Sequence, residues 1–121
     1  MRDAARDKVL FDTDVFVDHL RGARRLPRIA GSFSVITRAE LFAGDEKDEP
    51  TVRALLALLT EIPVDADIAE HAGRIRRSSG IRLPDAIIAA TALEHDLNLV
   101  TRNHRDFAPV RGLRVRDPAT F

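Results

Sequence analysis

The sequence contains no cysteine, no tryptophan and no tyrosine among its 121 residues. Without cysteine, the chain forms neither a disulfide nor a thiolate metal site, and a reducing compartment suits it. No apolar run approaches the ~18 residues that a membrane-spanning helix needs. The first residues, MRDAARDKVLF, are charged and lack the apolar stretch of a signal peptide. We therefore expect a cytoplasmic protein that has no membrane partner.

Lysine is also scarce, occurring only as Lys8 and Lys47, so arginine supplies most of the positive charge. Basic and acidic residues are equal in number, at 19 each, and this balance does not indicate a nucleic-acid-binding protein. Guanidinium groups nevertheless match the geometry of phosphate. The arginines are therefore either local phosphate contacts or simply solvated surface residues. The arginines gather in three clusters: Arg21, Arg24, Arg25 and Arg28; Arg74, Arg76, Arg77 and Arg82; and Arg111, Arg114 and Arg116.

Two common kinds of site are missing from the sequence. The four histidines show no HExxH or similar spacing, which argues against a zinc site. No glycine-rich phosphate loop is present, so nucleotide binding of the P-loop or Rossmann kind has no support.

Short apolar segments alternate with helical periodicity along the chain. This alternation predicts an α/β fold with a parallel sheet covered on both faces. The length suits a single domain, taken as residues 1–121. We expect strands at 8–11, 32–36, 61–64, 97–101 and 113–115, helices at 15–20, 37–43, 51–60, 65–77 and 84–93, and loops at 21–31 and 44–50.

The stretch from Leu83 to Phe107 is the most informative in the chain. Asp85 is the only ionisable residue between Leu83 and Leu93, in a segment that is otherwise apolar and rich in alanine. A carboxylate that leads so apolar a helix lies at the edge of the core, where an ion is costly unless it is paired or bound to a metal.

Other polar residues follow the predicted strands at their carboxyl ends. Asp12 follows the first strand, Glu40 lies in the first turn after the second, and Asn103 and Asp106 follow the strand at 97–101. Parallel sheets bind ligands beyond the carboxyl ends of their strands, so we expect these side chains to meet Asp85 in one crevice. Several carboxylates in one crevice repel one another unless a cation neutralises them. Oxygen ligands of this kind suit Mg²⁺ or Mn²⁺.

Each acidic residue also has a structural interpretation. Asp12 and Asp14 both suit the start of a helix, with Asp14 as the predicted N-cap. Thr37-x-x-Glu40 has the pattern of a capping box, and Asp85 after Pro84 suits a first helical turn. Asn103 and Asp106 are common turn residues. If all the carboxylates are caps, the chain is a non-catalytic interaction module with a partner surface on the amphipathic helices at 51–60 and 65–77.

Three segments, LFDTDVFVDHL, SVITRAELFAG and LPDAIIAATALEHDLNLVTRNHRDF, resemble the PIN domain and more narrowly the VapC toxins of toxin–antitoxin modules. The resemblance runs from Lys8 to about Val115, and the third segment is its most specific part. It implies a three-layer α/β/α domain with a short central parallel sheet. It also implies a Mg²⁺- or Mn²⁺-dependent endoribonuclease, usually a homodimer, that a small VapB-type antitoxin holds inactive.

The resemblance also implies roles for particular residues. By position, Asp12, Glu40 and Asp85 match the first three carboxylates of the family. The family often has an acidic residue where this chain has Asn103, and Asp106 is the candidate for that missing charge. We expect Asp12 and Asp85 to bind the metal directly, Glu40 and Asp106 to hold coordinated waters or a second ion, and Asn103 to assist. Asp14 stands where asparagine is common.

The substrate expected from the resemblance is RNA. Without tyrosine or tryptophan, base stacking is poorly supplied, so a folded RNA such as tRNA or an rRNA hairpin fits better than a flexible strand. We expect the phosphate contacts to come from arginines that flank the proposed site in sequence: Arg21, Arg24, Arg25, Arg28, Arg102 and Arg105.

A second enzyme class resembles part of the chain. LFDTDVF is similar to the nucleophile motif of haloacid-dehalogenase-type phosphatases. That family also needs a later lysine and a late paired-aspartate loop, and neither lysine is placed for it.

Overall fold

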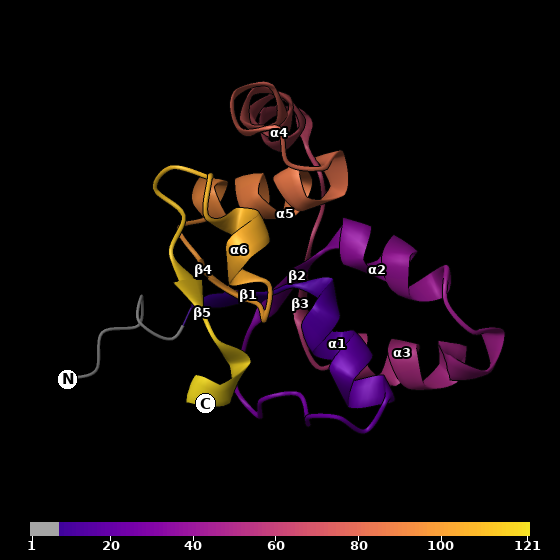
Figure 1. Cartoon of the computed structure of the whole chain (residues 1–121). Coiled ribbons are helices and arrows are strands. Elements are labelled where there is room, and N and C mark those ends of the chain that lie inside the picture. Colours follow the sequence, from indigo (N-terminus) through magenta and orange to yellow (C-terminus); the bar gives the residue numbers. More distant parts are fainter. Residues whose placement is uncertain (1–7) are drawn as a thin grey trace.

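A computed structural model of the protein describes residues 8–121, and its centre is one five-stranded sheet. The strands lie in the order β3-β2-β1-β4-β5, and every neighbouring pair is parallel. The predicted α/β/α fold with a short parallel sheet is therefore confirmed (Figure 1). The strands are β1 (Val9–Phe11), β2 (Ser32–Ser34), β3 (Thr60–Ile62), β4 (Asn98–Val100) and β5 (Val115–Arg116).

Helices cover both faces of the sheet, with α4 and α5 on one side and α1 and α3 on the other (Figure 1). The α-helices are α1 (Thr13–Leu20), α2 (Val35–Phe42), α3 (Glu49–Leu56), α4 (Ala66–Ser79), α5 (Leu83–Glu94) and α6 (His104–Phe107). Two short 3₁₀ helices are η2 (Glu46–Asp48) and η3 (Pro118–Thr120). Among the helices of residues 8–121, none combines the length and the apolar character of a membrane-spanning segment.

The central strand β1 supplies side chains to both hydrophobic cores because successive strand residues point to opposite faces. Leu10 belongs to the core under α5, whereas Val9 and Phe11 belong to the core under α1 and α3. In the second core, the ring of Phe16 packs edge-to-face against Phe11 and Phe33, with centroids 6.2 Å apart in both pairs. All three residues of β1 are buried, as expected of a central parallel strand.

The alanine-rich helix α5 lies between the sheet and α4 (Figure 1). Ala86, Ala89 and Ala90 are fully buried. Their small side chains allow α5 to lie close to its neighbours, and α4 packs its apolar residues Ile68 and Ile75 into the same core. This packing fixes the start of α5, and with it Asp85, against the carboxyl edge of the sheet.

Several predicted element boundaries are wrong. The N-cap of α1 is Asp12, which accepts a hydrogen bond from the Thr13 N–H, so Asp14 is not the cap. β2 ends at Ser34, which caps α2, so the predicted capping box between Thr37 and Glu40 does not form. Predicted ends also shift by a few residues elsewhere, because α3 begins at Glu49 and ends at Leu56, before β3 at Thr60–Ile62.

The predicted helix over 65–77 and the final edge strand are confirmed in outline. Asp65 caps α4, which continues to Ser79 and ends at Gly80, whose φ of 76° lies in the left-handed region that favours glycine. β5 is an edge strand of two residues beside β4. The single-domain prediction began at residue 1, and residues 1–7 lie outside the described part of the chain.

Candidate functional site

Asp12 lies at the carboxyl end of the central strand β1, and it is the most buried of the predicted site residues. Its relative exposure is 5%. One carboxylate oxygen accepts the Thr13 N–H at 2.8 Å, and the other accepts the Thr101 hydroxyl at 2.7 Å. Burial, together with the negative charges of Asp14 and Asp85, raises the pKa of Asp12 to about 7 even though these hydrogen bonds oppose the rise. The folded chain therefore holds a carboxyl group that lacks a compensating positive charge.

Asp14, one position into α1, leaves one oxygen without a partner. Its Oδ2 accepts a hydrogen bond from the Arg102 N–H at 3.1 Å and lies 3.1 Å from the Thr101 hydroxyl, whose one proton it shares with Asp12. Its Oδ1 is buried and has no hydrogen-bond partner among the described residues. Burial also raises the pKa of Asp14. A buried acceptor of this kind is costly unless a cation or a water satisfies it.

Glu40 reaches the site from α2 through a chain of hydroxyl groups. The Thr13 hydroxyl donates to Glu40 Oε1 at 2.6 Å, and the Thr37 hydroxyl lies 2.9 Å from that of Thr13. Because the Thr13 hydroxyl donates its only proton to Glu40, the Thr37 hydroxyl is the donor in its hydrogen bond with Thr13. Thr13 therefore binds a site carboxylate, and Thr37, which the sequence analysis interpreted only as a helix cap, lies next to it.

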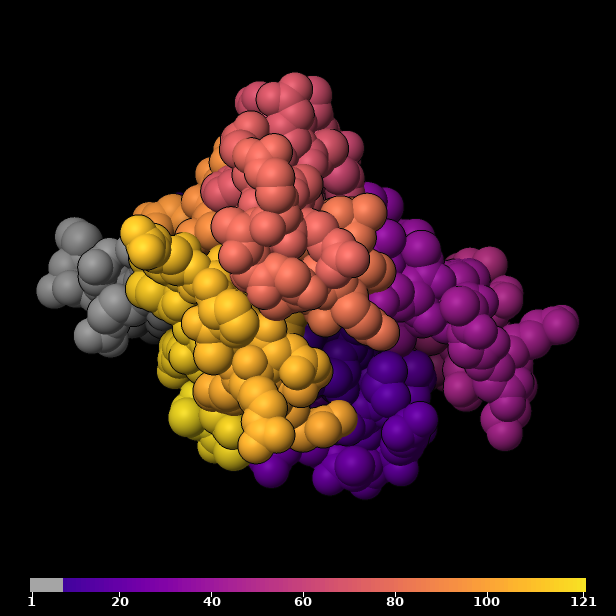
Figure 2. Space-filling view, turned by 45° about the horizontal axis from the view of Figure 1, so that its top comes forward, coloured from indigo at the N-terminus to yellow at the C-terminus, as the bar shows by residue number. Residues whose placement is uncertain are grey.

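Asp85 stands in the first turn of α5 and borders two adjacent hollows. Burial raises its pKa; the nearby charge of Arg82 lowers it, and those of Glu40 and Asp106 raise it. The first hollow, of about 220 Å³, opens where α1, α2, the start of α5 and the α6 segment meet (Figure 2). It is lined by Asp12, Thr13, Asp14, Val17, Glu40, Arg82, Asp85 and Asn103.

The fourth-position residues Asn103 and Asp106 divide between the two hollows. Asn103 lines the first hollow, whereas Asp106 lines the second, of about 230 Å³, together with Arg82 and Asp85. The Asn103 amide donates to Asp106 Oδ2 at 2.8 Å, so the two side chains act as one unit at the start of α6. The structure therefore brings four of the five predicted residues into one hollow and the fifth next to it.

The donor set fits a hard divalent cation. It consists of carboxylate, amide and hydroxyl oxygens, it includes a buried oxygen without a partner among the described residues, and it holds three carboxyl groups whose pKa values are raised mainly by burial. As the side chains stand, no three acidic or imidazole groups of residues 8–121 are close enough to enclose an ion. Coordination would therefore require the carboxylates to move inward.

An ion pair beside the site was not predicted from the sequence. Asp18 is buried in α1, with 8% exposure, and accepts hydrogen bonds from Arg102 Nε at 2.6 Å and Nη2 at 3.1 Å. This pair holds the segment between β4 and α6 against α1, and it occupies two donors of a guanidinium that was predicted to bind phosphate. The i,i+4 spacing of Asp14 and Asp18 on α1 was the available signal, because it places both carboxylates on the side of the helix that meets this segment.

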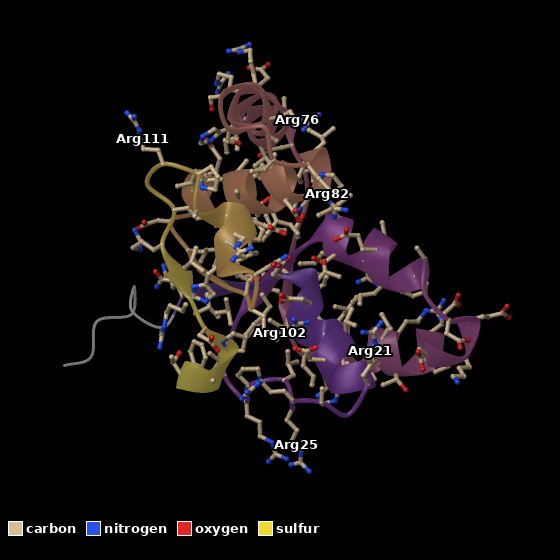
Figure 3. All side chains as sticks on the ribbon, in the orientation of Figure 1. Arg21, Arg25, Arg76, Arg82, Arg102 and Arg111 are labelled. Atoms are coloured by element: carbon tan, nitrogen blue, oxygen red, sulfur yellow. The ribbon has the colours of Figure 1, made fainter. Side chains whose placement is uncertain are left out.

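The remaining arginines of the predicted phosphate-binding set are spread over the surface. Figure 3 shows Arg25 at the end of the molecule away from α5 and Arg82, whereas Arg102 lies beside α1. Arg25 and Arg28 line a separate groove of about 700 Å³, which is largely apolar and runs beside the end of α3. Its other lining residues include Leu55, Leu58 and Leu59, and Leu58 is 76% exposed.

The two alternative interpretations find less support in this geometry. The phosphatase interpretation needs a lysine at the site, but Lys8 lies at the amino end of β1 and Lys47 pairs with Asp45 on the exposed η2. The capping interpretation holds for Asp12, which does cap α1. It fails for Glu40, because its carboxylate binds Thr13 of another helix.

Comparison with known proteins gives a consistent result. Residues 9–113 match the family model of the PIN domain. Ribonuclease VapC10 of Mycobacterium tuberculosis is 40% identical over 111 residues, which cover 78% of this chain and 82% of that protein. Ribonuclease VapC19 of the same species is 34% identical over 113 residues, which cover 81% and 90%. A toxin–antitoxin complex from Klebsiella pneumoniae contains a chain with 36% identity and a TM-score of 0.76, covering 91% of this chain and 97% of that one.

Proposed function

The chain belongs to the PIN-domain family, and on that footing we propose that it is a metal-dependent endoribonuclease and the toxin of a toxin–antitoxin pair. The observation that supports metal dependence is that Asp12 and Asp85 lie in the same hollow. Both carboxyl groups line one hollow at the carboxyl edge of the sheet, and burial raises the pKa of both. A polyanionic substrate requires that this negative charge be offset.

Asp12 and Asp85 would hold a Mg²⁺ or Mn²⁺ ion directly, with Glu40, Asp106 and Asn103 around it. When bound, the ion supplies a hydrolytic nucleophile by lowering the pKa of water, and it offsets charge on the phosphoryl oxygens. The chain itself orients the carboxylates. The Thr13 N–H and the Thr101 hydroxyl fix both oxygens of Asp12, and the Thr13 hydroxyl fixes Glu40. Such supporting hydrogen bonds set the geometry of a metal site.

The substrate proposed is a folded RNA, such as tRNA or an rRNA hairpin. Four of the six phenylalanines, Phe11, Phe16, Phe33 and Phe107, are fully buried, so they are not available to stack on bases. This scarcity of accessible aromatic side chains favours recognition by shape and phosphate contacts. Mapping the ends of RNA fragments after brief induction in cells tests this proposal, and scattered cuts in unpaired mRNA would contradict it.

The partner proposed is a VapB-type antitoxin, and we also propose a homodimer of the chain. Helix α4 buries its apolar residues against α5, which leaves the groove beside α3 as the better candidate for an antitoxin segment. Arg25 and Arg28 at this groove favour a segment that carries acidic residues beside its apolar ones. Light scattering of the protein alone and with its antitoxin measures both assemblies. The absence of cysteine suits a cytoplasmic location.

The decisive experiment compares RNA cleavage with and without a chelator. With Mg²⁺ present, the unmodified protein should cleave RNA, and EDTA should abolish this activity. Asp85→Asn should reduce cleavage by at least about 100-fold, because it removes a charge on which ion binding depends. The matched control is Asp67→Asn, which alters an exposed aspartate that also lies in the first turn of its helix, α4. Cleavage that survives EDTA would overturn the metal dependence, and full activity of Asp85→Asn would remove Asp85 from the site.

A further inference from the structure

Arg82 immediately precedes α5 and stands on the wall that the two hollows share. It lines the hollow that contains Asp12 and Glu40, and it also lines the adjoining hollow that contains Asp106. Within the described residues, it is the one cationic side chain that lines the first hollow. Figure 3 shows it beside the start of α5, whereas Arg102 lies beside α1.

The two arginines differ in how their donors are used. Arg102 places Nε and Nη2 within hydrogen-bond distance of Asp18. Arg82 has only a loose contact, with its Nε 3.7 Å from Asp85 Oδ2. The side chain of Arg82 is 75% exposed, whereas that of Asp85 is 15% exposed. The guanidinium of Arg82 therefore keeps its hydrogen-bond donors available to a ligand in front of the site.

The free hydrogen-bond donors of Arg82 matter because the side chains around it are negatively charged. The first hollow is lined by four carboxylates, which repel an approaching RNA phosphate. A guanidinium at its edge offers a phosphate two parallel charge-assisted hydrogen bonds. Because Arg82 and Asp85 line both hollows, a strand that runs from one hollow to the other passes these two residues.

Resting on the proposed function, we propose that Arg82 binds a backbone phosphate of the RNA substrate where the strand crosses Asp85 between the two hollows. Arg82 then contacts substrate and positions it for cleavage, whereas Arg102 has a structural role. The arginine thus supplies the attraction that the acidic site lacks. The contact is to phosphate and not to a base, so it raises affinity for RNA without selecting a sequence.

The test measures cleavage of a labelled RNA hairpin that the unmodified protein cuts, at several salt concentrations, for three variants. Arg82→Ala should lower kcat/KM by about tenfold or more, mostly through KM, because a charged hydrogen-bonding partner is lost. The slope of log kcat/KM against log salt concentration should become shallower by about one, as expected when one phosphate contact is removed. Arg82→Lys keeps the charge and should retain the salt slope.

The matched control is Arg111→Ala, which removes the same charge from an exposed position that Figure 3 shows far from the site. It should leave kcat/KM and the salt slope unchanged. The proposal is overturned if Arg82→Ala behaves like Arg111→Ala, if it speeds cleavage, or if Arg82→Lys loses as much of the salt slope as Arg82→Ala. If the unmodified protein cleaves no RNA at all, the proposed function fails instead, so the two failures are distinguishable.

Discussion

Two buried carboxylates near the start of the chain, Asp12 and Asp18, show opposite ways of accommodating negative charge. Both are almost inaccessible, with 5% and 8% exposure, and both lie at or within α1. Asp18 faces the guanidinium of Arg102 and accepts two hydrogen bonds from it. Asp12 accepts hydrogen bonds only from neutral donors, those of Thr13 and Thr101. The two carboxylates are thus similar in burial and differ in whether a cationic side chain pairs with them.

This comparison is the reason for placing Asp12, and not Asp18, in the proposed metal site. A compensated pair fixes structure, because its charges are satisfied within the chain. An uncompensated carboxyl group with a pKa raised to about 7 costs stability, and its placement in a hollow with Asp85 points to a cation from outside the chain. The two residues should therefore respond in opposite directions to the loss of their charge.

The largest effect is expected for Asp12→Asn. This change should lower RNA cleavage by about 1,000-fold, because it removes a charge that the ion requires. Stability of the protein in chelator should rise at neutral pH, because an uncharged amide no longer carries the cost of burying a charge. Asparagine also remains a good N-cap for α1. Cleavage assays and thermal unfolding in EDTA measure the two effects.

The same variant also provides a way to break the comparison. If Asp12→Asn unfolds at a lower temperature than the unmodified protein in EDTA, the carboxylate is stabilising and the distinction from Asp18 fails. Asp67→Asn serves as the control again, and it should change neither measurement.

A second, smaller effect is the pH dependence of stability without metal. The folded-state pKa values of Asp12, Asp14 and Asp85 are all raised above their ordinary values, mainly by burial. Between pH ~4 and pH ~7 the folded state thus binds more protons than the unfolded state, so the free energy of unfolding falls as pH rises. For Asp12, the loss over this range is on the order of a few kcal/mol.

Chemical denaturation in EDTA at about pH 5 and about pH 8 measures this loss. Asp12→Asn should flatten the dependence, because it removes the group whose pKa is raised to about 7. Millimolar Mg²⁺ should restore stability at the higher pH by binding only the folded state. A stability that rises from the lower to the higher pH in EDTA would contradict the raised pKa values.

The parts of this molecule that follow from local pattern were predictable from the sequence. The strand at Val9–Phe11 is a short apolar run, and the helix at Leu83–Glu94 is a long alanine-rich segment that opens with Pro84. The rule that parallel strands present their carboxyl ends at one edge was enough to bring Asp12, Glu40 and Asp85 into one hollow.

Long-range partners were not predictable in this way. Thr101 lies 89 residues from Asp12, and Arg102 lies 84 residues from Asp18. The residue pattern within a segment does not indicate which distant residue its side chains will contact. The capping box at Thr37 and Glu40 was wrong for a related reason, since Ser34 supplies the cap and both side chains turn toward Thr13 on another helix. Local hydrogen-bonding patterns therefore gave way to tertiary contacts.

The smallest effect is expected for Asp18→Asn, which tests whether Asp18 has a structural role. Stability should fall by about 1–3 kcal/mol, since half of the pair is buried but the Arg102 side chain is 55% exposed and screened by solvent. Cleavage should fall by less than about tenfold, because the Arg102 N–H still anchors the β4–α6 segment to Asp14.

Adding Arg102→Gln to this variant separates charge pairing from mere contact. In a double-mutant cycle, the two changes together should cost less than the sum of the separate costs, by about 1 kcal/mol, because each single change already removes the shared interaction. Urea denaturation of the four proteins provides the cycle. If Asp18→Asn instead matches Asp12→Asn in its loss of cleavage while remaining fully stable, Asp18 acts at the site, and compensation by a neighbouring arginine no longer distinguishes a structural carboxylate from a functional one.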